Sequence, residues 1–178
     1  MRVCVRRFLC VGSAPLNKEH KTVLDLGAHT GQASKEFVLP GDRWILVDNQ
    51  QYLQYNGWAI PQTPEGAEYL IGDIMDYHSP AEIVVCSNVL YHVPDPFALL
   101  RHLRKLTLGK LILRTYFDEG DAGWNFYGEQ RPAHSHQGTA ATIFYRPTLN
   151  GLRKALKEAG FEIVKEEPSG DMVTIIVK

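Results

Sequence analysis

Short apolar runs alternate with amphipathic segments along the chain. The runs that predict strands are Thr22–Leu26, Trp44–Val47, Tyr69–Ile71, Glu82–Cys86, Leu111–Arg114, Phe161–Val164 and Met172–Val177. Runs without polar alternation are typical of strands that are covered on both sides, as in a parallel sheet. The pattern therefore favours a sheet whose two faces are both buried.

The amphipathic segments between these runs predict helices at Gln32–Val38, Gln51–Trp58, Pro96–Leu106 and Thr148–Ala159. Leucines recur at helical spacing in the third of these segments, which also begins with a proline. In the fourth segment, Thr148 is suited to cap the start and Gly160 to end the helix.

Alternating strands and helices predict an α/β fold with a mostly parallel seven-stranded sheet and helices on both faces. No helix separates the last two strands, so their tight connection requires an antiparallel C-terminal strand. We expect one domain over residues 1–178. Residues 117–147 form a long, aromatic-rich insert without clear periodicity, which we expect to be a lid on the substrate side.

Composition narrows the functional classes. The chain has 178 residues, is 44% hydrophobic and carries a formal net charge of −1, which disfavours extended nucleic-acid binding. Cys4, Cys10 and Cys86 are too scattered for a disulfide framework or a zinc site. No segment approaches the roughly 20 apolar residues of a membrane span, and arginines interrupt the apolar stretch at the N-terminus. We expect a cytoplasmic protein that does not contact a membrane.

Polar residues follow each of the first four predicted strands. They are a glycine bend at Asp25–Gly31, Asp48, the Gly72–Ile74 turn, and Ser87–His92. Open α/β sheets bind ligands at the carboxyl edge of their strands. A glycine bend that opens a helix lets backbone N–H groups approach a ligand, and an acid at a strand end can accept both hydroxyls of a ribose.

These four segments resemble the motifs of class I S-adenosylmethionine (SAM)-dependent methyltransferases. The matching stretches are Val23–Gly31, Trp44–Asp48, Gly72–Ile74 and Cys86–Asp95, within a resemblance that spans about residues 22–114. The family implies a doubly wound, Rossmann-like sheet with a reversed last strand, SAM as cofactor and S-adenosylhomocysteine (SAH) as product.

The resemblance implies roles for the residues of the glycine bend. Asp25 would orient the bend and the methionine ammonium group, and Gly27, Ala28 and Gly31 would line the methionine part. His29 stands where the family commonly has its middle glycine, so its side chain must either point away from the cofactor or contact it.

The resemblance also assigns the nucleoside. Asp48, with Asn49 alongside, would hold the ribose hydroxyls. Asp73 would contact the adenine amine, with Ile74 against the ring, and Asn88 would lie beside the methionine end. We therefore expect the acids at the ends of the first three strands to converge on one cleft of nucleoside shape.

The catalytic candidates are His92, as a general base, and Tyr91, as a group that positions the acceptor. Packing is an equally good explanation for His92. Trp124, Tyr127 and Arg146 are candidates for the acceptor pocket, although they could simply pack the insert onto the domain. His134 and His136 form an isolated pair without further ligands, so we expect no metal.

The favoured function is methyl transfer from SAM to a small molecule. A non-catalytic module that binds SAM or SAH is an alternative. The segment Phe144–Thr148 is also similar to a subgroup related to wobble-uridine tRNA modification enzymes, whose donor is a carboxylated SAM, but this chain lacks that subgroup's large N-terminal region. The reversed last strand argues against a nicotinamide-dependent reductase. The sequence does not indicate an oligomeric state.

Overall fold

A computed structural model of the chain describes residues 20–49, 64–121, 123–130 and 142–178. The helix predicted at Gln51–Trp58, as well as Cys4 and Cys10, lies outside these residues. The helices are η1 (Lys35–Phe37), η2 (Ile74–Asp76), η3 (Leu90–His92), α2 (Pro96–Leu106) and α3 (Leu149–Glu158). The strands are β1 (Thr22–Leu26), β2 (Arg43–Asp48), β3 (Ala67–Ile71), β4 (Ala81–Ser87), β5 (Thr107–Tyr116), β6 (Trp124–Gln130), β7 (Thr142–Pro147), β8 (Ile163–Ser169) and β9 (Met172–Val177).

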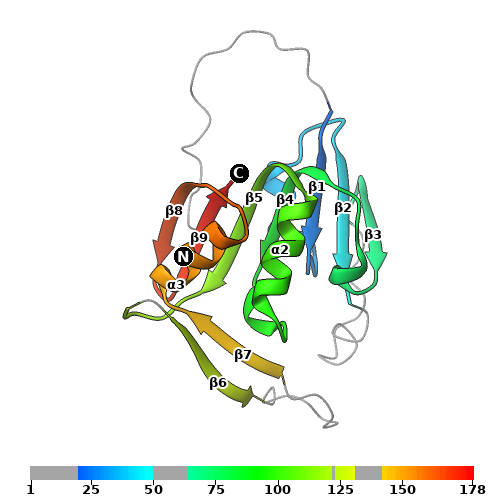
Figure 1. Cartoon of the computed structure of the whole chain (residues 1–178). Coiled ribbons are helices and arrows are strands. Elements are labelled where there is room, and N and C mark those ends of the chain that lie inside the picture. Colours follow the sequence, from blue (N-terminus) through cyan, green and yellow to red (C-terminus); the bar gives the residue numbers. More distant parts are fainter. Residues whose placement is uncertain (1–19, 50–63, 122, 131–141) are drawn as a thin grey trace.

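Seven strands form one sheet in the order β3-β2-β1-β4-β5-β9-β8 (Figure 1). The pairs from β3 to β5 are parallel, whereas β9 is antiparallel to both β5 and β8. This arrangement confirms the predicted mostly parallel sheet with a reversed last strand. The strand order reverses between β1 and β4, which creates the crevice where open α/β sheets bind ligands.

The register brings the carboxyl ends of the strands together. Leu26 pairs with Val47 on one side and with Cys86 on the other, and Asp48 pairs with Ile71. The residues that follow these positions therefore meet at one edge of the sheet, as the motif spacing predicts.

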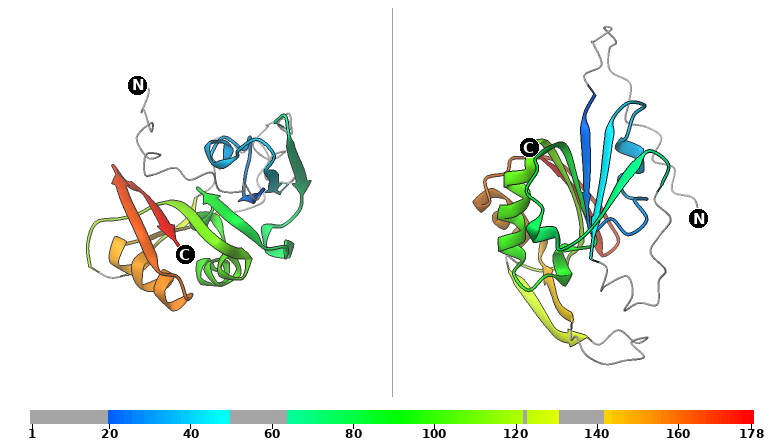
Figure 2. Two further views of the ribbon diagram at one scale, coloured as in Figure 1. Left: turned by 90° about the horizontal axis from the view of Figure 1, so that it is seen from above. Right: turned by 90° about the vertical axis from the view of Figure 1, so that its right-hand side faces the viewer.

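The two faces of the sheet carry separate apolar clusters, because successive side chains of a strand point to opposite faces. One cluster joins Leu24, Val84 and Leu113 to the leucines of α2 and α3. The other joins Val23, Trp44 and neighbouring side chains to the segment that carries η1. Figure 2 shows α2 and the η1 segment on opposite sides of the sheet.

Local capping explains where the two α-helices begin. The Asp95 carboxylate accepts a hydrogen bond from the Ala98 N–H at the start of α2, and the Thr148 hydroxyl accepts one from Gly151 at the start of α3. Gly160, with φ +89°, follows the end of α3 in the left-handed conformation typical of a helix end. The last two predicted helices are therefore confirmed with nearly their predicted bounds.

One expectation needs correction. Residues 32–38 form turns and the single 3₁₀ turn η1 instead of an α-helix, because the N–H groups of Phe37 and Val38 donate to carbonyls only three residues back. The insert at 117–147 contains an antiparallel ribbon, in which Trp124 pairs with Pro147 and Phe126 with Tyr145. This ribbon extends from the carboxyl edge of the sheet, below α2 in Figure 1.

Candidate active site

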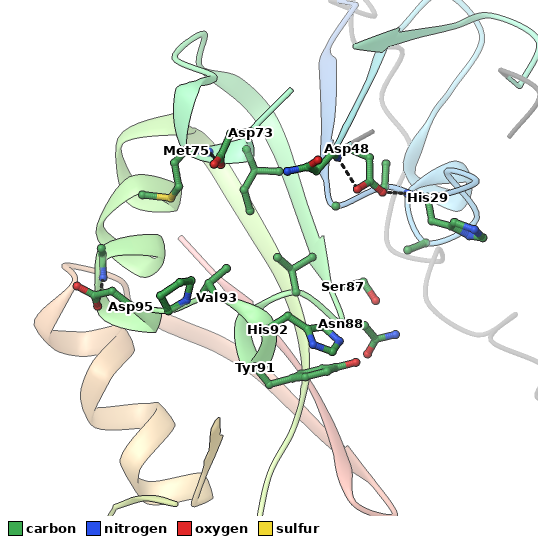
Figure 3. Close-up of a pocket in the computed structure, with 18 of the residues that line it drawn as sticks. His29, Asp48, Asp73, Met75, Ser87, Asn88, Tyr91, His92, Val93 and Asp95 are labelled. Atoms are coloured by element: carbon green, nitrogen blue, oxygen red, sulfur yellow. Dashed lines mark hydrogen bonds between the residues drawn. The ribbon is translucent and has the colours of Figure 1, made fainter. Parts of the chain in front are cut away.

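A cavity of about 790 Å³ lies at the carboxyl edge of the sheet (Figure 3). This volume is in the range of small-molecule sites. The cavity is lined by the glycine bend, the end of β2, the turn after β3, and the segment from the end of β4 to the first turn of α2. The lining residues are Gly27, Ala28, His29, Thr30, Gln32, Ala33, Asp48, Asn49, Asp73, Ile74, Met75, Ser87, Asn88, Val89, Tyr91, His92, Val93, Pro94, Asp95 and Ala98.

The glycine bend is held against the end of β2. The N–H groups of Gly27 and Ala28 donate to the Val47 carbonyl at 2.8 and 3.2 Å. Gly27 has φ +75°, and a Cβ atom there would overlap the side chain of Val89. Only glycine fits this position, because both the backbone conformation and the close approach exclude a side chain.

His29 adopts the left-handed conformation of the glycine that it replaces, with φ +48°. Its N–H donates to the Asp48 carboxylate at 2.6 Å, and its carbonyl accepts from the Tyr69 hydroxyl at 2.9 Å. In Figure 3 the His29 ring lies on the far side of Asp48 from Asp73. The departure from the family motif therefore leaves the bend intact and connects it to both β2 and β3.

Asp48 is a buried acceptor at the cavity, with 6% of its surface exposed. Its two oxygens accept from the N–H groups of His29 and Asn49, at 2.6 and 2.7 Å. Burial raises the pKa of Asp48, although these two donors oppose the shift. Because each carboxylate oxygen has two lone pairs, Asp48 can accept further hydrogen bonds from a ligand.

Asp25 lies outside the cavity lining. It is 1% exposed, and neither of its oxygens has a hydrogen bond of good geometry within the part of the chain that the structure describes. Burial raises the pKa of Asp25 to about 7, against a lowering by the nearby Ser34 hydroxyl, and the charge of Asp48 raises it further. The expected convergence of three acids on one cleft thus holds for Asp48 and Asp73 and is wrong for Asp25.

The turn after β3 forms the opposite wall. One oxygen of Asp73 accepts from the Met75 N–H at 2.9 Å and so caps η2. Ile74 and Met75 add apolar surface to the cavity, and Ile74 is 9% exposed. The Ile74 carbonyl lies 3.0 Å from Nε2 of His102, which comes from α2. A carboxylate beside an apolar side chain suits a planar ring with an exocyclic amine.

The segment after β4 forms the remaining wall. Asn88 has φ +62°, and its N–H donates to the Arg114 carbonyl at 2.9 Å. Tyr91 is 6% exposed, and its ring centroid lies 4.1 Å from that of His92 and 5.0 Å from that of Tyr116. Burial lowers the pKa of His92 to about 4, so the imidazole is neutral at physiological pH.

Two of the residues predicted for the acceptor pocket, Trp124 and Arg146, are not among the described residues that line the cavity. Trp124 packs against Phe97 of α2, with ring centroids 5.0 Å apart. The Arg146 guanidinium lies over the Tyr116 ring at 4.7 Å and within 3.8 Å of an Asp118 oxygen. These contacts favour packing of the ribbon onto the domain. Tyr127 lies in β6, and its side chain is outside the described residues.

Sequence reasoning missed several residues of the site. Tyr69 supports the bend through the hydrogen bond from its hydroxyl to the His29 carbonyl, but its position in an apolar run predicts only an aromatic residue of a strand. Val89 and Asp95 lie inside a recognised motif and could have been included from their position alone. Cys86 is buried below the site with a raised pKa, as expected for a core thiol.

No group of three or more His, Cys, Asp or Glu residues could hold a metal ion within the described ranges, and His134 and His136 lie outside them. Among the described helices, none is long and apolar enough to cross a membrane.

Comparison with known proteins gives consistent matches. The tRNA U34 carboxymethyltransferase of Nautilia profundicola is 27% identical over 158 residues, which cover 84% of this chain and 50% of that protein. The chain thus spans half the length of this relative. The N-terminal domain of EvdMO1, crystallised with SAH and D-fucose, has a TM-score of 0.60 at 20% identity, covering 88% of this chain and 74% of that one.

A second solved structure has the same fold. The 1,6-didemethyltoxoflavin-N1-methyltransferase of Burkholderia thailandensis has a TM-score of 0.63 at 17% identity, covering 89% of this chain and 70% of that one. A family model described as a methyltransferase domain matches residues 5–166, which is most of the chain. The strand order, the motifs at the carboxyl edge and this match together establish that the chain belongs to the class I SAM-dependent methyltransferases.

Proposed function

We propose that the cavity binds SAM and that the protein transfers its methyl group to a small-molecule acceptor. The observation that carries the proposal is the position of Asp48. It is a buried carboxylate at the end of β2, facing the cavity between the glycine bend and the Asp73–Ile74 wall. A ribose presents two hydroxyl donors, and a carboxylate in this place suits both of them.

The remaining residues fit the rest of the cofactor. Asp73 and Ile74 offer an acceptor and an apolar surface for adenine. Gly27 and Ala28 give a wall without bulky side chains, where the methionine part can lie close to the backbone. Asn88, on the other side of the cavity, would face the methionine end.

SAM supplies a methyl group that is already activated by the positive charge on its sulfur. The chain therefore has to position the acceptor in line with that group, with the reacting atoms about 3–3.5 Å apart. Tyr91 and His92 are the candidates for this task, because they line the cavity beyond Asn88. Before transfer, the neutral imidazole of His92 places no second positive charge beside the sulfonium. When the imidazole accepts the proton of the acceptor it becomes positively charged, and the sulfur becomes neutral as its methyl group leaves.

A second candidate is carboxymethyl transfer to a tRNA uridine. It is favoured by the 27% identity to the Nautilia profundicola tRNA U34 carboxymethyltransferase over 84% of this chain. The net charge of −1 supports the small-molecule acceptor instead, because a tRNA surface is recognised largely through its phosphates. The TM-score of 0.63 to the 1,6-didemethyltoxoflavin-N1-methyltransferase gives the fold a small-molecule precedent.

Calorimetry and a transfer assay test the proposal. We expect SAH to bind the purified chain and NADH not to bind. Mass spectrometry of reactions with SAM or carboxylated SAM, each with a small-molecule panel or with tRNA, then identifies the transferred group and the acceptor. Carboxymethyl-tRNA as the product would establish the second candidate. Tight SAH binding without transfer to any acceptor would support a non-catalytic module, and no SAH binding would overturn the proposal.

A further inference from the structure

A buried imidazole lies directly behind the proposed adenine wall. His102 is on α2 and is 8% exposed, and its Nε2 atom lies 3.0 Å from the Ile74 carbonyl oxygen. The two residues are 28 positions apart. Residue spacing alone does not single out His102, since a histidine on an amphipathic helix is expected at the surface.

The His102 contact provides a hydrogen-bond donor for the Ile74 carbonyl, which the single turn of η2 does not itself supply. The backbone hydrogen bond within this turn runs from the Asp76 N–H to the Asp73 carbonyl. A buried carbonyl without a partner costs free energy, and the His102 N–H supplies the partner. The imidazole contact is therefore part of what holds η2 in place.

His102 can hold η2 firmly because α2 itself is fixed. Leu99, Leu103 and Leu106 of this helix are at most 2% exposed in the main core cluster. A donor on a rigid helix fixes the peptide that it contacts, and Ile74 is the residue next to Asp73. The position of the Asp73 carboxylate thus follows from α2 through one hydrogen bond and one peptide.

We propose that His102 is a positioning residue that sets the base specificity of the donor site. This inference rests on the proposed function, in which Asp73 accepts from the adenine amine. Hypoxanthine carries a carbonyl oxygen in place of that amine and would meet the carboxylate with two acceptors face to face. A well-placed Asp73 rejects hypoxanthine, whereas an Asp73 that can shift rejects it less.

The test compares His102→Leu with His102→Gln, whose side-chain amide can still donate to the Ile74 carbonyl. Thr107→Val is the matched control. Thr107 is 4% exposed and donates to the Leu103 carbonyl at 2.7 Å, so its loss removes a buried hydrogen bond at the C-terminal end of α2 that does not involve η2. Titration calorimetry measures the Kd of SAH and of its hypoxanthine analogue for each variant, and thermal unfolding measures stability.

We expect His102→Leu to reduce the preference for SAH over the analogue by about five- to tenfold, which is the size of one hydrogen bond to a buried group. His102→Gln should keep the preference for SAH within about twofold of the wild-type value. Thr107→Val should lower the stability of the protein and leave this preference unchanged. The ratio of the two Kd values is informative because a general loss of stability weakens the binding of both ligands equally and leaves the ratio unchanged.

An unchanged preference in His102→Leu would overturn the inference and leave the proposed function intact. Equal losses in His102→Leu and Thr107→Val would also overturn it, since the effect would then be structural. If His102→Leu does not fold, His102→Asn, whose shorter amide cannot reach the carbonyl, takes its place with the same expected loss. A wild-type protein that binds neither ligand would instead contradict the proposed function.

Discussion

The two sides of the cavity are built differently. On the donor side, backbone N–H groups of the glycine bend donate to the Val47 carbonyl of β2 and to the Asp48 carboxylate, and the Met75 N–H of η2 donates to Asp73. On the side proposed for the acceptor, the Tyr91 ring packs against the rings of His92 and Tyr116, and Arg146 of the adjoining ribbon lies over Tyr116. Backbone hydrogen bonds at strand ends specify one geometry, whereas ring contacts allow side chains of different size. The donor side is therefore suited to one ligand, and the acceptor side to variation between relatives.

The largest expected effect concerns Asp25, the buried acid near the end of β1 that does not line the cavity. The pKa of Asp25 is about 7 in the folded protein and about 3.8 without burial, so the folded state binds the proton more tightly. Stability from this group is complete below pH 4 and is lost as the pH rises through 7. The Asn side chain has no such charge, so Asp25→Asn should be more stable than the wild type at pH 8 by as much as ~4 kcal/mol. This figure follows from the difference between the two pKa values, at about 1.4 kcal/mol per pKa unit.

Urea unfolding at several pH values measures this difference. Asp42→Asn is a control of opposite sign. There, slight desolvation of Asp42 is outweighed by hydrogen bonds from the N–H groups of Lys21 and Leu39, which lower its pKa. Its contribution is lost as the pH falls, so the variant should lose stability relative to the wild type at neutral pH and not at low pH. Parallel pH profiles for Asp25→Asn and the wild type would contradict the burial argument.

The next effect tests the acceptor side. His92→Ala should lower kcat by about 10²-fold and change the Kd of SAH by less than about threefold, because His92 is assigned to the acceptor. This loss of kcat is at the low end of the roughly 10²- to 10⁴-fold that general bases contribute, since an imidazole with a pKa of about 4 is a weak base. Wild-type kcat should be flat near neutral pH and fall only as the pH approaches 4. Full turnover in the variant would show that His92 only packs against Tyr91.

Asp48→Ala tests the donor side. It should weaken SAH binding by roughly 1.5–3 kcal/mol, because it removes a charged acceptor and leaves the His29 N–H without its partner. Calorimetry at constant salt measures the change. Glu36→Ala removes an exposed acid of η1 and serves as the control. Equal affinities for Asp48→Ala and Glu36→Ala would refute the ribose assignment.

The smallest effect separates packing from acceptor binding in the ribbon. Trp124→Leu removes the ring contact with Phe97, which is worth about 0.5–1.5 kcal/mol of stability, and should leave SAH binding unchanged. The KM for the acceptor decides the role of Trp124. If the KM for the acceptor rises more than about tenfold under conditions where the variant is fully folded, Trp124 contributes to acceptor binding.

The donor side could be predicted from the sequence because each of its features lies next to its strand along the chain. A glycine bend, an acid and a capped turn each follow an apolar run directly, and a parallel register brings the run ends together. The helix predicted at residues 32–38 was wrong because their apolar spacing does not indicate that the Phe37 and Val38 N–H groups bond three residues back, as in a 3₁₀ turn. The placement of Asp25 was also missed, because periodicity alone cannot tell an acid that faces a cavity from one buried beneath it.

The acceptor side could not be predicted to the same depth. Trp124 and Phe126 alternate with Asn125, and this is the one local sign of the strand β6. The contacts of Trp124 with Phe97 and of Arg146 with Tyr116 join segments that are distant in the chain. Such contacts depend on the three-dimensional arrangement, so nothing in the spacing of these residues indicates whether they face a ligand or one another.

The position of β9 between β5 and β8 has a consequence for the order in which the protein assembles. β8 pairs with β9 alone, so it has no place in the sheet until residues 172–177 have been synthesised. Until then β5 presents an open strand edge, which is a site for pairing with other chains. A ribosome that pauses before β9 would thus leave a nascent chain with its ligand-binding edge largely assembled and its opposite flank exposed to aggregation.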